Sequence, residues 1–511
     1  MQIFSFSPFG YEGALVTVEV DLRRGIPAVD IVGLADGAVK ESRERMQAAI
    51  RNAGFSFPPE RVLISLSPAD LKKEGAGFDL PIAVGVLKAQ AECSGTVFAE
   101  EKILVMGELE LSGKVRAVKG VNAAVSTAIA QGIRRCLVPE QNAEEAREVP
   151  GALVYGADCL ESAIRALGEE GAFEGRQGGE PDDGGVEFRR MEAGFEYAEI
   201  KGQERLVRAL EIAAAGGHNL IAVGSPGCGK TMAIQKFPAI TPLLTKEEAY
   251  SVTRIWSLAG LIKPSEPLVK NPPFRIPHQT ASLEGMCGGG QNCRPGEISL
   301  AHNGVLFLDE AAEFKTSVLQ MLRVPLESGR VSLSRAGRST CYPANFQLLM
   351  AVNPCPCGNY GSSAKICLCS EKSVDLYWKK FSAPLLDRID LRIFVDLPKQ
   401  SFSDEEKGRS TEELQKEIRI AVKAQRKRQG IKNAKLSPEQ ILNFCKTDSA
   451  GKKLLEEAAE RFSFSPRAIS SCLRTARTIA DLAGSQDISC EHLTEAIDFR
   501  KLCSTIPPDL M

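Results

Sequence analysis

The sequence has no hydrophobic run long enough to cross a membrane. Hydrophobic residues make up 43% of its 511 residues, yet no apolar stretch approaches the roughly 20 residues that a membrane-spanning helix needs. Residues 1–10 also lack the basic region followed by an apolar core that marks a secretory signal. We therefore expect a cytoplasmic protein without membrane contact.

An excess of positive charge is also missing, and so is an even set of cysteines. The formal net charge is −2 and the isoelectric point is about 6.3, so any contact with nucleic acid has to come from a local basic patch. The 15 cysteines are an odd number in a chain without an export signal, which favours reduced thiols over a disulfide framework. Metal binding by some of these cysteines stays open.

The length of the chain predicts roughly two or three domains. Residues 1–166 mix strand-like and helix-like patterns, which predicts an α/β domain. Residues 167–190 contain many glycines and acids and have little to bury, which predicts a flexible linker. An α/β ATPase core is expected over 191–398, and the pattern of 399–511 is mainly helical. The sequence shows no internal repeat.

A glycine-rich segment follows a short apolar run and precedes a stretch that can open a helix. It reads Gly224, Ser225, Pro226, Gly227, Cys228, Gly229, Lys230 and Thr231. Its glycines permit a tight turn whose N–H groups cradle phosphate oxygens at a helix N-terminus. Lys230 would reach the β- and γ-phosphates, and the Thr231 hydroxyl would bind Mg²⁺. The pattern predicts an ATP-binding P-loop rather than a chance glycine-rich turn.

The apolar run 304–308 ends in two carboxylates, Asp309 and Glu310. We expect Asp309 to hold Mg²⁺ through its waters, and Glu310 to orient and polarise the water that attacks the γ-phosphate. The alternative is a strand that merely ends in two surface acids. The distance of the pair from the P-loop disfavours that alternative.

Several longer motifs carry a resemblance to a known family. They are residues 294–304 with Asp309 and Glu310, and residues 353–358, 384–390, 476–482, 29–34 and 73–80. Through them nearly the whole chain, apart from the linker, resembles the ComM/YifB group of magnesium-chelatase-type AAA+ ATPases. The resemblance implies a ring, usually a hexamer, with ATP and Mg²⁺ bound between subunits. It also implies a helical lid of the magnesium-chelatase type over 399–511.

The resemblance gives roles to three polar residues. Asn353 is expected to be the sensor that helps to place the attacking water. Arg388 is expected to be the finger that reaches the γ-phosphate of the neighbouring subunit, and Arg467 the second sensor, which reports the phosphate state to the lid. The structural alternatives are a strand-end cap for Asn353 and a solvated helix face for Arg467. Arg388 could instead pair with Asp387 or Asp390.

Two closely spaced cysteine pairs flank a turn-rich loop, Cys355 with Cys357 and Cys367 with Cys369. Four thiolates can close a tetrahedral structural zinc site, which would order a small loop with little core. The spacing within each pair is tighter than in common zinc motifs, so reduced thiols without a ligand are the alternative. Cys228 is expected either to form a reactive thiolate or to be a small residue that fits the phosphate loop.

The N-terminal domain resembles the proteolytic domain of Lon, in which a lysine activates a serine nucleophile. In our alignment Gly77 occupies the serine position and Asn122 the lysine position, and neither can do that chemistry. We therefore expect a Lon-like fold without peptidase activity, used as a ring or substrate-contact module. The nearby Ser67 and Lys119 are expected to be structural.

The segment 327–346 predicts a hairpin that carries Arg330, Arg335 and Arg338. It resembles the hairpin that precedes the first sensor in this clade and projects into the ring pore. Arginines there would grip a DNA backbone by charge, without reading sequence, and a solvated hairpin is the alternative. The Pro-His-His-Thr stretch of the family reads Pro-His-Gln-Thr at 277–280, so any role that needs both histidines is in doubt.

The leading hypothesis is a hexameric DNA motor, dependent on ATP and Mg²⁺, that moves strands or junctions during recombination or natural transformation. ComM-like proteins are associated with DNA branch migration. The second hypothesis is an ATPase that remodels a protein or metal-insertion partner, as magnesium chelatase does. An ATP-dependent protease is disfavoured by Gly77 and Asn122.

Overall fold

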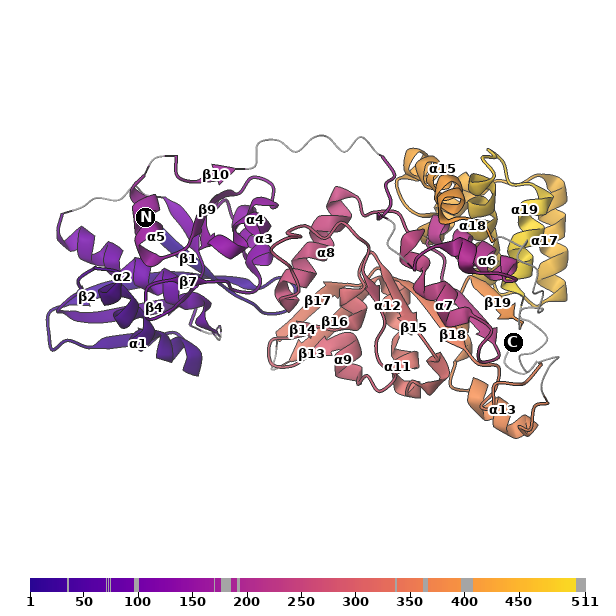
Figure 1. The fold of residues 1–511 in the computed structure, drawn as a ribbon, viewed down its shortest axis with the longest axis horizontal. Helices are drawn as coiled ribbons and strands as arrows, with labels where there is room; N and C mark the ends of the chain where they lie inside the picture. Colours follow the sequence, from indigo (N-terminus) through magenta and orange to yellow (C-terminus); the bar gives the residue numbers. More distant parts are fainter. Residues whose placement is uncertain are drawn as a thin grey trace.

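The computed structural model describes residues 1–34, 36–69, 71, 73, 75–95, 101–169, 171–175, 185–190, 194–335, 338–361, 366–396 and 408–501. The molecule is elongated, with a first sheet at one end, a second sheet in the middle and the last helices at the other end (Figure 1). The domain boundaries expected at 191 and at 398–399 lie outside the described residues.

The first sheet of the described structure has eight strands in the order β10-β9-β8-β5-β1-β2-β4-β3. Their bounds are β1 Gln2–Ser7, β2 Ala14–Arg23, β3 Val29–Val32, β4 Arg61–Ser67, β5 Lys102–Val105, β8 Arg135–Pro139, β9 Leu153–Ala157 and β10 Glu174–Gly175. β2 pairs antiparallel with β1 and β4, whereas β1, β5, β8 and β9 run parallel. β4 alternates buried with less buried residues, as a strand with one face on a core does.

Helices pack on this sheet. Their bounds are α1 Gly37–Asn52, α2 Asp79–Cys93, α3 Val121–Ala130, α4 Glu140–Arg147 and α5 Leu160–Gly168. The first half of α2 is buried along Asp79–Leu87 because this helix packs against β2. The buried carboxylate of Asp79 accepts hydrogen bonds from Arg45 Nε at 2.9 Å and from the N–H of Leu109 at 3.2 Å. These bonds offset the cost of burying its charge.

Parts of the segment expected as a linker are packed against the two sheets. β10 pairs antiparallel with β9, and the ring of Phe173 lies 6.0 Å from that of Tyr155. Further along, Val186 is buried and Phe188 forms a backbone bridge with Pro242. The described ends of this segment are therefore anchored, one on each sheet.

The second sheet is parallel and has five strands in the order β12-β15-β18-β11-β19. Their bounds are β11 Leu220–Gly224, β12 Phe274–Arg275, β15 Val305–Leu308, β18 Gln347–Val352 and β19 Leu391–Val395. The inner strands β15, β18 and β11 are buried at every residue, as in parallel sheets with helices on both faces. Because the strands are parallel, their carboxyl ends share one edge, where ligands of such sheets bind.

Helices and short hairpins surround the second sheet. The helices are α6 Glu204–Gly216, α7 Lys230–Gln235, α8 Lys246–Ala259, α9 Leu283–Cys287, α10 Glu297–Leu300, α11 Thr316–Met321, α12 Arg323–Ser328, α13 Glu371–Trp378 and α14 Ala383–Leu386. Two hairpins are β13 Gly288–Gly289 with β14 Arg294–Pro295, and β16 Arg330–Arg335 with β17 Arg338–Pro343. A further pair, β6 Glu108–Leu109 with β7 Val115–Arg116, belongs to the first domain. The β16–β17 hairpin lies in the segment where the sequence predicts one.

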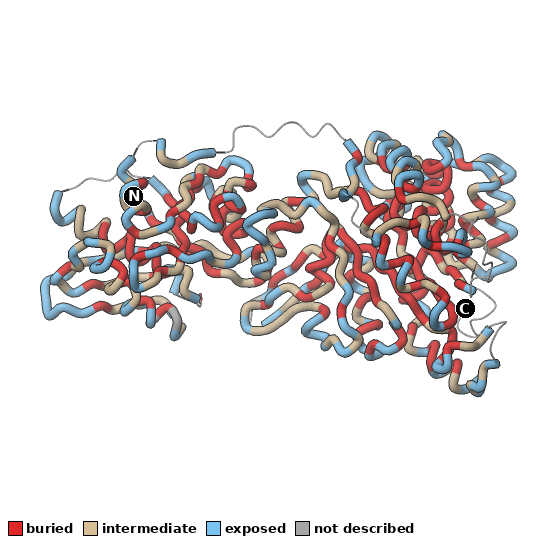
Figure 2. The backbone as a smooth tube through the Cα atoms, viewed as in Figure 1, coloured by how far each residue is buried: buried red, intermediate tan, exposed pale blue. Residues whose placement is uncertain are grey.

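The C-terminal part is helical and shares its core with the second sheet. Its helices are α15 Thr411–Gln429, α16 Pro438–Phe444, α17 Ser449–Arg461, α18 Pro466–Leu482 and α19 Cys490–Arg500. Serine side chains accept an N–H from the first turn of α15, α16, α18 and α19, which stabilises these helix starts. One hydrophobic cluster joins α6, the sheet and α18. Figure 2 shows that buried residues run through the middle and the C-terminal end of the molecule. The structure thus confirms the predicted α/β class with a helical C-terminal part.

The first domain contacts the second through α3 and α8. Ser257 of α8 donates a hydrogen bond to the buried carboxylate of Glu145, which also accepts the N–H of Asn122 at 3.0 Å. Nearby, the N–H of Tyr11 donates to Thr340 Oγ1 of β17 at 3.0 Å. The first domain therefore touches both α8 and the β16–β17 hairpin.

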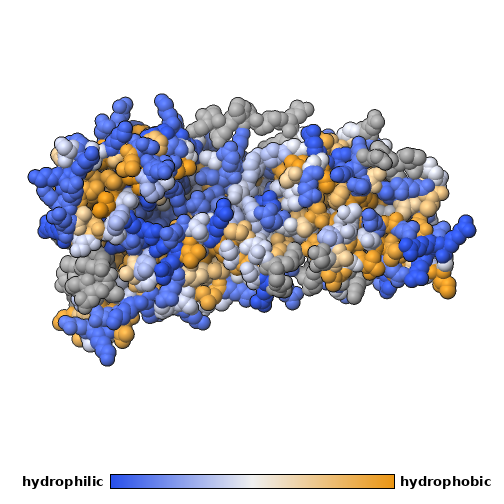
Figure 3. Space-filling model, turned by 180° about the vertical axis from the view of Figure 1, so that it is seen from behind, coloured by the Kyte–Doolittle hydropathy of each residue, from blue (hydrophilic) through white to orange (hydrophobic). Residues whose placement is uncertain are grey.

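Among the described residues, no helix combines the length and the apolar composition that a membrane crossing requires. On the face seen in Figure 3, hydrophobic and hydrophilic residues are intermixed.

Candidate active site

The predicted P-loop has the expected order of strand, loop and helix. β11 ends at Gly224 and α7 begins at Lys230. Gly229, directly before the helix, has φ +90°, a left-handed conformation in which a side chain would be strained. The first N–H groups of a helix have no partner within it, so the loop delivers free donors to the carboxyl edge of the sheet.

The ammonium group of Lys230 lies inside this loop. Its Nζ donates hydrogen bonds to the carbonyls of Gly224 at 2.5 Å and Ser225 at 2.9 Å, and it lies 3.5 Å from Cys228 Sγ. Only 1% of the Cys228 surface is exposed. That burial favours the interpretation of Cys228 as a small residue that fits the loop.

Thr231 and Asp309 meet at the end of β15. Thr231 Oγ1 donates a hydrogen bond to Asp309 Oδ1 at 2.9 Å, although the two residues come from different strand–loop units. A hydroxyl and a carboxylate are hard oxygen donors of the kind that Mg²⁺ prefers. The residues therefore fit the predicted magnesium site, beside the loop that would hold the phosphates.

Glu310 has a strained backbone and a partner that the motifs did not predict. Its φ and ψ are 48° and 49°, the left-handed region that residues other than glycine rarely adopt and that occurs often at active sites. Its Oε2 accepts a hydrogen bond from Gln279 Nε2 at 2.6 Å. Gln279 is the residue at which the sequence departs from the Pro-His-His-Thr pattern, and this departure was the one available signal.

Asn353 follows β18, the strand between β11 and β15. It therefore lies at the carboxyl edge between the P-loop and Asp309. Its backbone carbonyl accepts a hydrogen bond from the Tyr377 hydroxyl at 3.0 Å. Among the described residues, its side-chain amide has no hydrogen-bond partner, which leaves the amide available to a ligand.

Arg388 and Arg467 meet at one carboxylate, that of Glu327 in α12. Arg388 Nη2 pairs with Oε2, and Arg467 Nη2 lies 2.8 Å from Oε1. Hydrogen bonds from Arg388 and then Arg467 hold the pKa of Glu327 below its usual value. The sequence gave no role to Glu327, because nothing in its local pattern links it to either arginine.

The aspartates beside Arg388 have other partners. Asp387 Oδ1 accepts hydrogen bonds from Arg500 Nη2 at 2.7 Å and from Ser465 Oγ at 3.1 Å. Burial alone would raise the pKa of Asp390, but the hydrogen bond and charge of His218 hold it at about 2. The ion pair of Arg388 therefore involves Glu327, and neither of the two aspartates considered as alternatives.

The predicted DNA-contacting arginines lie on the β16–β17 hairpin. Arg330 and Arg335 are exposed at the two ends of β16. The register places Arg335 opposite Arg338. The side chain of Arg338 and residues 336–337 lie outside the described part of the chain.

The Lon-like positions contain no serine–lysine pair. Asn122 is buried at the start of α3, and its N–H bonds to Glu145. Gly77 lies in a short turn before α2, where an added Cβ would be 3.8 Å from Val118. The aliphatic part of Lys119 packs against Gly260, which is a structural contact.

The four cysteines predicted to bind zinc lie together. The sulfur atoms of Cys355, Cys357, Cys367 and Cys369 are all within 4.8 Å of one another.

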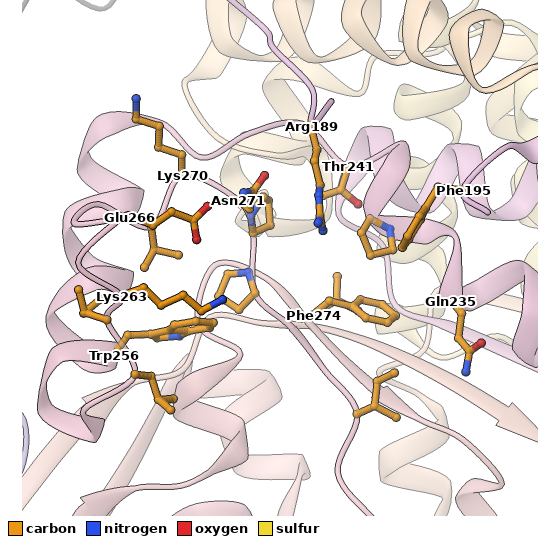
Figure 4. Close-up of a pocket in the computed structure, with 18 residues that line it drawn as sticks. Arg189, Phe195, Gln235, Thr241, Trp256, Lys263, Glu266, Lys270, Asn271 and Phe274 are labelled. Carbon is orange, nitrogen blue, oxygen red and sulfur yellow. The ribbon is translucent and has the colours of Figure 1, made fainter. Parts of the chain in front are cut away.

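A cavity of about 500 Å³ lies elsewhere. Figure 4 shows Trp256, Lys263 and Glu266 on one side of it and Arg189 and Phe195 on the other. It is bordered by Val305, the first residue of β15. The cavity is thus at the amino ends of the strands, away from the edge that holds the P-loop.

Three family models match successive parts of the chain. "Subunit ChlI of Mg-chelatase" matches residues 18–142, and "Magnesium chelatase, subunit ChlI" matches residues 196–402. "Magnesium chelatase, subunit ChlI C-terminal" matches residues 408–500. The matches cover most of the first domain, the second sheet and the C-terminal helices.

Relatives match over nearly the full length. The chain is 38% identical to YifB of Escherichia coli over 495 residues, which are 96% of this chain and 95% of YifB. It is 37% identical to the competence protein ComM of Haemophilus influenzae over 503 residues, 98% of this chain and 97% of ComM. A Lon protease of Trichlorobacter lovleyi is 21% identical over 148 residues, 28% of this chain and 18% of the protease. The chain belongs to the ComM/YifB group of magnesium-chelatase-like AAA+ ATPases.

Proposed function

We propose that this ATPase is a homo-hexameric cytoplasmic motor that moves DNA strands or junctions during recombination or natural transformation. The observation that carries the proposal is the β16–β17 hairpin. Arg330 and Arg335 are exposed on it and have no acidic partner among the described residues. A full-length relative is named a competence protein, which supports a role in transformation.

The charge on the hairpin is suited to a polyanion. Arg330 and Arg335 are both exposed at the ends of β16, and the register places a further arginine position, 338, opposite Arg335. Arginines bind phosphates through charge and paired N–H groups, without reading the base sequence. The hairpin therefore supports a DNA grip that does not depend on sequence.

The same hairpin is joined directly to the ATPase residues. β16 follows α12, which carries Glu327, and β17 runs into β18, whose end carries Asn353. If hydrolysis moved Asn353, the movement would reach β17 of the hairpin through β18. If it opened the ion pairs of Glu327, the movement would reach β16 of the hairpin through α12. This connectivity supports the coupling of ATP hydrolysis to movement of DNA.

The positions of the site residues support a role for each of them. Lys230 would bind the β- and γ-phosphates beside the N-terminus of α7, and Glu310 would polarise the attacking water while Gln279 holds its carboxylate. Asn353 helps to place that water. Mg²⁺ at Thr231 and Asp309 would neutralise charge on the phosphate oxygens.

The ring would share each nucleotide between two subunits. Arg388 and Arg467 both pair with the carboxylate of Glu327, so one subunit presents the two cations side by side. In the assembled ring, we propose that the γ-phosphate of the neighbouring subunit takes the place of that carboxylate. Charge that develops on the phosphoryl group would then be stabilised by two arginines.

The affinity for a four-way DNA junction tests the hairpin directly. It is measured with a non-hydrolysable ATP analogue at increasing salt. Arg335→Ala should weaken binding of all DNA sequences alike and lower the slope of log affinity against log salt by about 1 or more. Arg24→Ala removes an exposed arginine after β2 and should change neither quantity. Unchanged affinity and slope in both Arg330→Ala and Arg335→Ala would contradict the proposal.

A second candidate is an ATPase that remodels a protein or metal-insertion partner. The observation in its favour is that magnesium-chelatase models match both domains and the C-terminal helices. It predicts ATP hydrolysis that responds to a protein partner and to no form of DNA. A proteolytic function is disfavoured by Gly77 and Asn122, which provide no nucleophile and no base.

A further inference from the structure

Four sulfur atoms converge beside the nucleotide-binding edge of the second sheet. Cys355 Sγ lies 3.3 Å from that of Cys357 and 3.7 Å from that of Cys367, and the sulfurs of Cys357 and Cys367 are 3.6 Å apart. The sulfur of Cys369 completes a group that spans at most 4.8 Å. Among the described residues, this is the one cluster of three or more histidine, cysteine or acidic side chains with metal-binding geometry.

The distances among the sulfurs of Cys355, Cys357 and Cys367 match three thiolates around one metal ion, and Cys369 lies near enough to be the fourth. Zinc binds sulfur at about 2.3 Å, so two ligands of a tetrahedral site are about 3.8 Å apart. A disulfide requires about 2.05 Å between its sulfur atoms. The measured separations of 3.3, 3.6 and 3.7 Å are too long for a disulfide and close to the tetrahedral spacing.

The second cysteine pair lies on the segment 366–369, which gains little stabilisation from the burial of hydrophobic side chains. Residues 366–369 form neither helix nor strand. Ile366 and Leu368 are 85% and 89% exposed, while Cys367 and Cys369 face the hydrophobic core. Burying aliphatic side chains of this size stabilises a fold, and the exposed Ile366 and Leu368 do not contribute that stabilisation. Metal–thiolate bonds would supply the missing stabilisation.

The first cysteine pair lies against the P-loop. Gly358 has φ +77°, and its N–H donates to the carbonyl of Cys355 at 2.9 Å. A Cβ on Gly358 would come within 2.5 Å of Pro226 Cδ, so this turn and the phosphate loop are in close contact. Trp378 Nε1 donates to the carbonyl of Pro354 at 2.9 Å, which fixes the other side of the turn.

We propose that Cys355, Cys357, Cys367 and Cys369 bind one structural Zn²⁺, and that this site holds the 354–358 turn against Pro226 and so supports the nucleotide-binding loop. The four thiols release their protons to solvent when the metal binds. Zinc has no redox chemistry, and four protein ligands leave no open position, so the site is structural. The proposal is independent of DNA and of the motor function.

Metal content tests the site itself. Full-length protein purified without chelator should contain about one zinc per chain, and the double variant Cys367→Ser/Cys369→Ser should contain almost none. Cys93→Ser and Cys341→Ser, which replace exposed cysteines outside the cluster, should keep the metal. Cys369→His, which retains a zinc ligand, should keep it as well. Zinc well below one per chain in the wild-type protein, with no thiolate-to-cobalt charge-transfer band after addition of Co²⁺, would overturn the proposed site.

Nucleotide affinity tests the support of the P-loop. A fluorescent ATP analogue should bind on the order of tenfold more weakly to the double variant, which corresponds to about 1.4 kcal/mol, and Cys369→His should restore most of the affinity. Removing the metal from the wild-type protein with a chelator should weaken nucleotide binding to the same extent, and adding Zn²⁺ should restore it. This comparison uses no variant, so misfolding of a variant cannot explain the result. Equal affinity with and without zinc would overturn the supporting role. Neither the metal content nor the nucleotide affinity is measured with DNA. A failure of the zinc proposal can therefore be distinguished from a failure of the motor proposal.

Discussion

Arg388 pairs with Glu327, which lies 61 residues earlier in the chain. The other oxygen of the same carboxylate is 2.8 Å from Arg467 Nη2. The two arginines proposed to act on a neighbouring nucleotide thus share one anion of their own subunit. In the proposed ring, a phosphate from the next subunit would compete with that carboxylate.

The first prediction concerns this competition. Glu327→Gln removes the negative charge and frees both arginines for the phosphate. We expect the KM for ATP of the assembled ring to fall by about two- to fivefold, since exposed ion pairs contribute about 1 kcal/mol or less. Steady-state ATP hydrolysis measures this change. Glu456→Gln, at an exposed site on α17, should leave the KM unchanged. An unchanged or higher KM in Glu327→Gln would show that the carboxylate does not compete.

The second prediction concerns Gln279, the partner of the carboxylate proposed to be catalytic, Glu310. Gln279→Leu removes the 2.6 Å hydrogen bond to Glu310. Hydrogen bonds to charged groups contribute about 1.5–3 kcal/mol, and the bond of Gln279 is exposed to solvent, so we take the low end of that range. We therefore expect kcat to fall by about tenfold while the KM for ATP changes little. The exposed Gln131→Leu serves as the control in the same kinetic assay. A fall in affinity without a fall in kcat would place Gln279 in binding rather than in positioning Glu310.

The third prediction concerns pH. Burial lowers the pKa of His302 to about 4, below the value of about 6.5 expected in the unfolded chain. Between these two values the unfolded state binds a proton at His302 and the folded state does not. The contribution of His302 to the free energy of unfolding is therefore complete above about pH 6.5 and is lost as the pH decreases towards 4. Between pH 7.5 and 5 the loss from this group should be at most about 2 kcal/mol.

Unfolding by urea at the two pH values measures this loss. His302→Gln should be less pH-dependent than the wild-type protein, because it lacks the titrating ring. His278→Gln, at an exposed histidine, should keep the wild-type pH dependence. Equal pH dependence in all three proteins would remove His302 as its cause.

The fourth prediction concerns the contact between the domains. Ser257→Ala deletes the hydroxyl that donates to the buried carboxylate of Glu145. Burial already raises the pKa of Glu145, and the Ser257 hydrogen bond opposes that shift. Loss of the donor should cost about 1–3 kcal/mol and lower the first thermal transition by several degrees. Calorimetry should find no shift for Ser94→Ala, at an exposed serine after α2.

Much of the local structure of the proposed nucleotide site was predictable because its motifs are compact. The P-loop needs a strand, glycines and a lysine within a few residues, and the strand ending in Asp309 is equally compact. The proximity of Thr231 and Asp309 was predictable because the motifs assign both residues to one Mg²⁺ site. Glu327 was not predictable, since its partners lie 61 and 140 residues away and no spacing rule connects them.

The expected linker shows a second limit of sequence reasoning. Glu174 and Gly175 have no apolar pattern, yet they form β10 because their backbone groups pair with β9. The packing of Phe173 on Tyr155 adds a contact that composition does not reveal. The zinc-type cysteine cluster was foreseen from spacing, but its contact with Pro226 depends on how two distant turns fold together.

The rate of ATP hydrolysis without DNA and with single-stranded DNA, duplex or a four-way junction tests the central claim most directly. Glu310→Gln measures the background rate, and Arg335→Ala tests the hairpin. The account predicts strong stimulation by DNA that weakens with salt and is lost in Arg335→Ala while ATP still binds. An assembled ring that hydrolyses ATP at the same rate with and without every form of DNA would contradict it and would favour the remodelling of a protein partner.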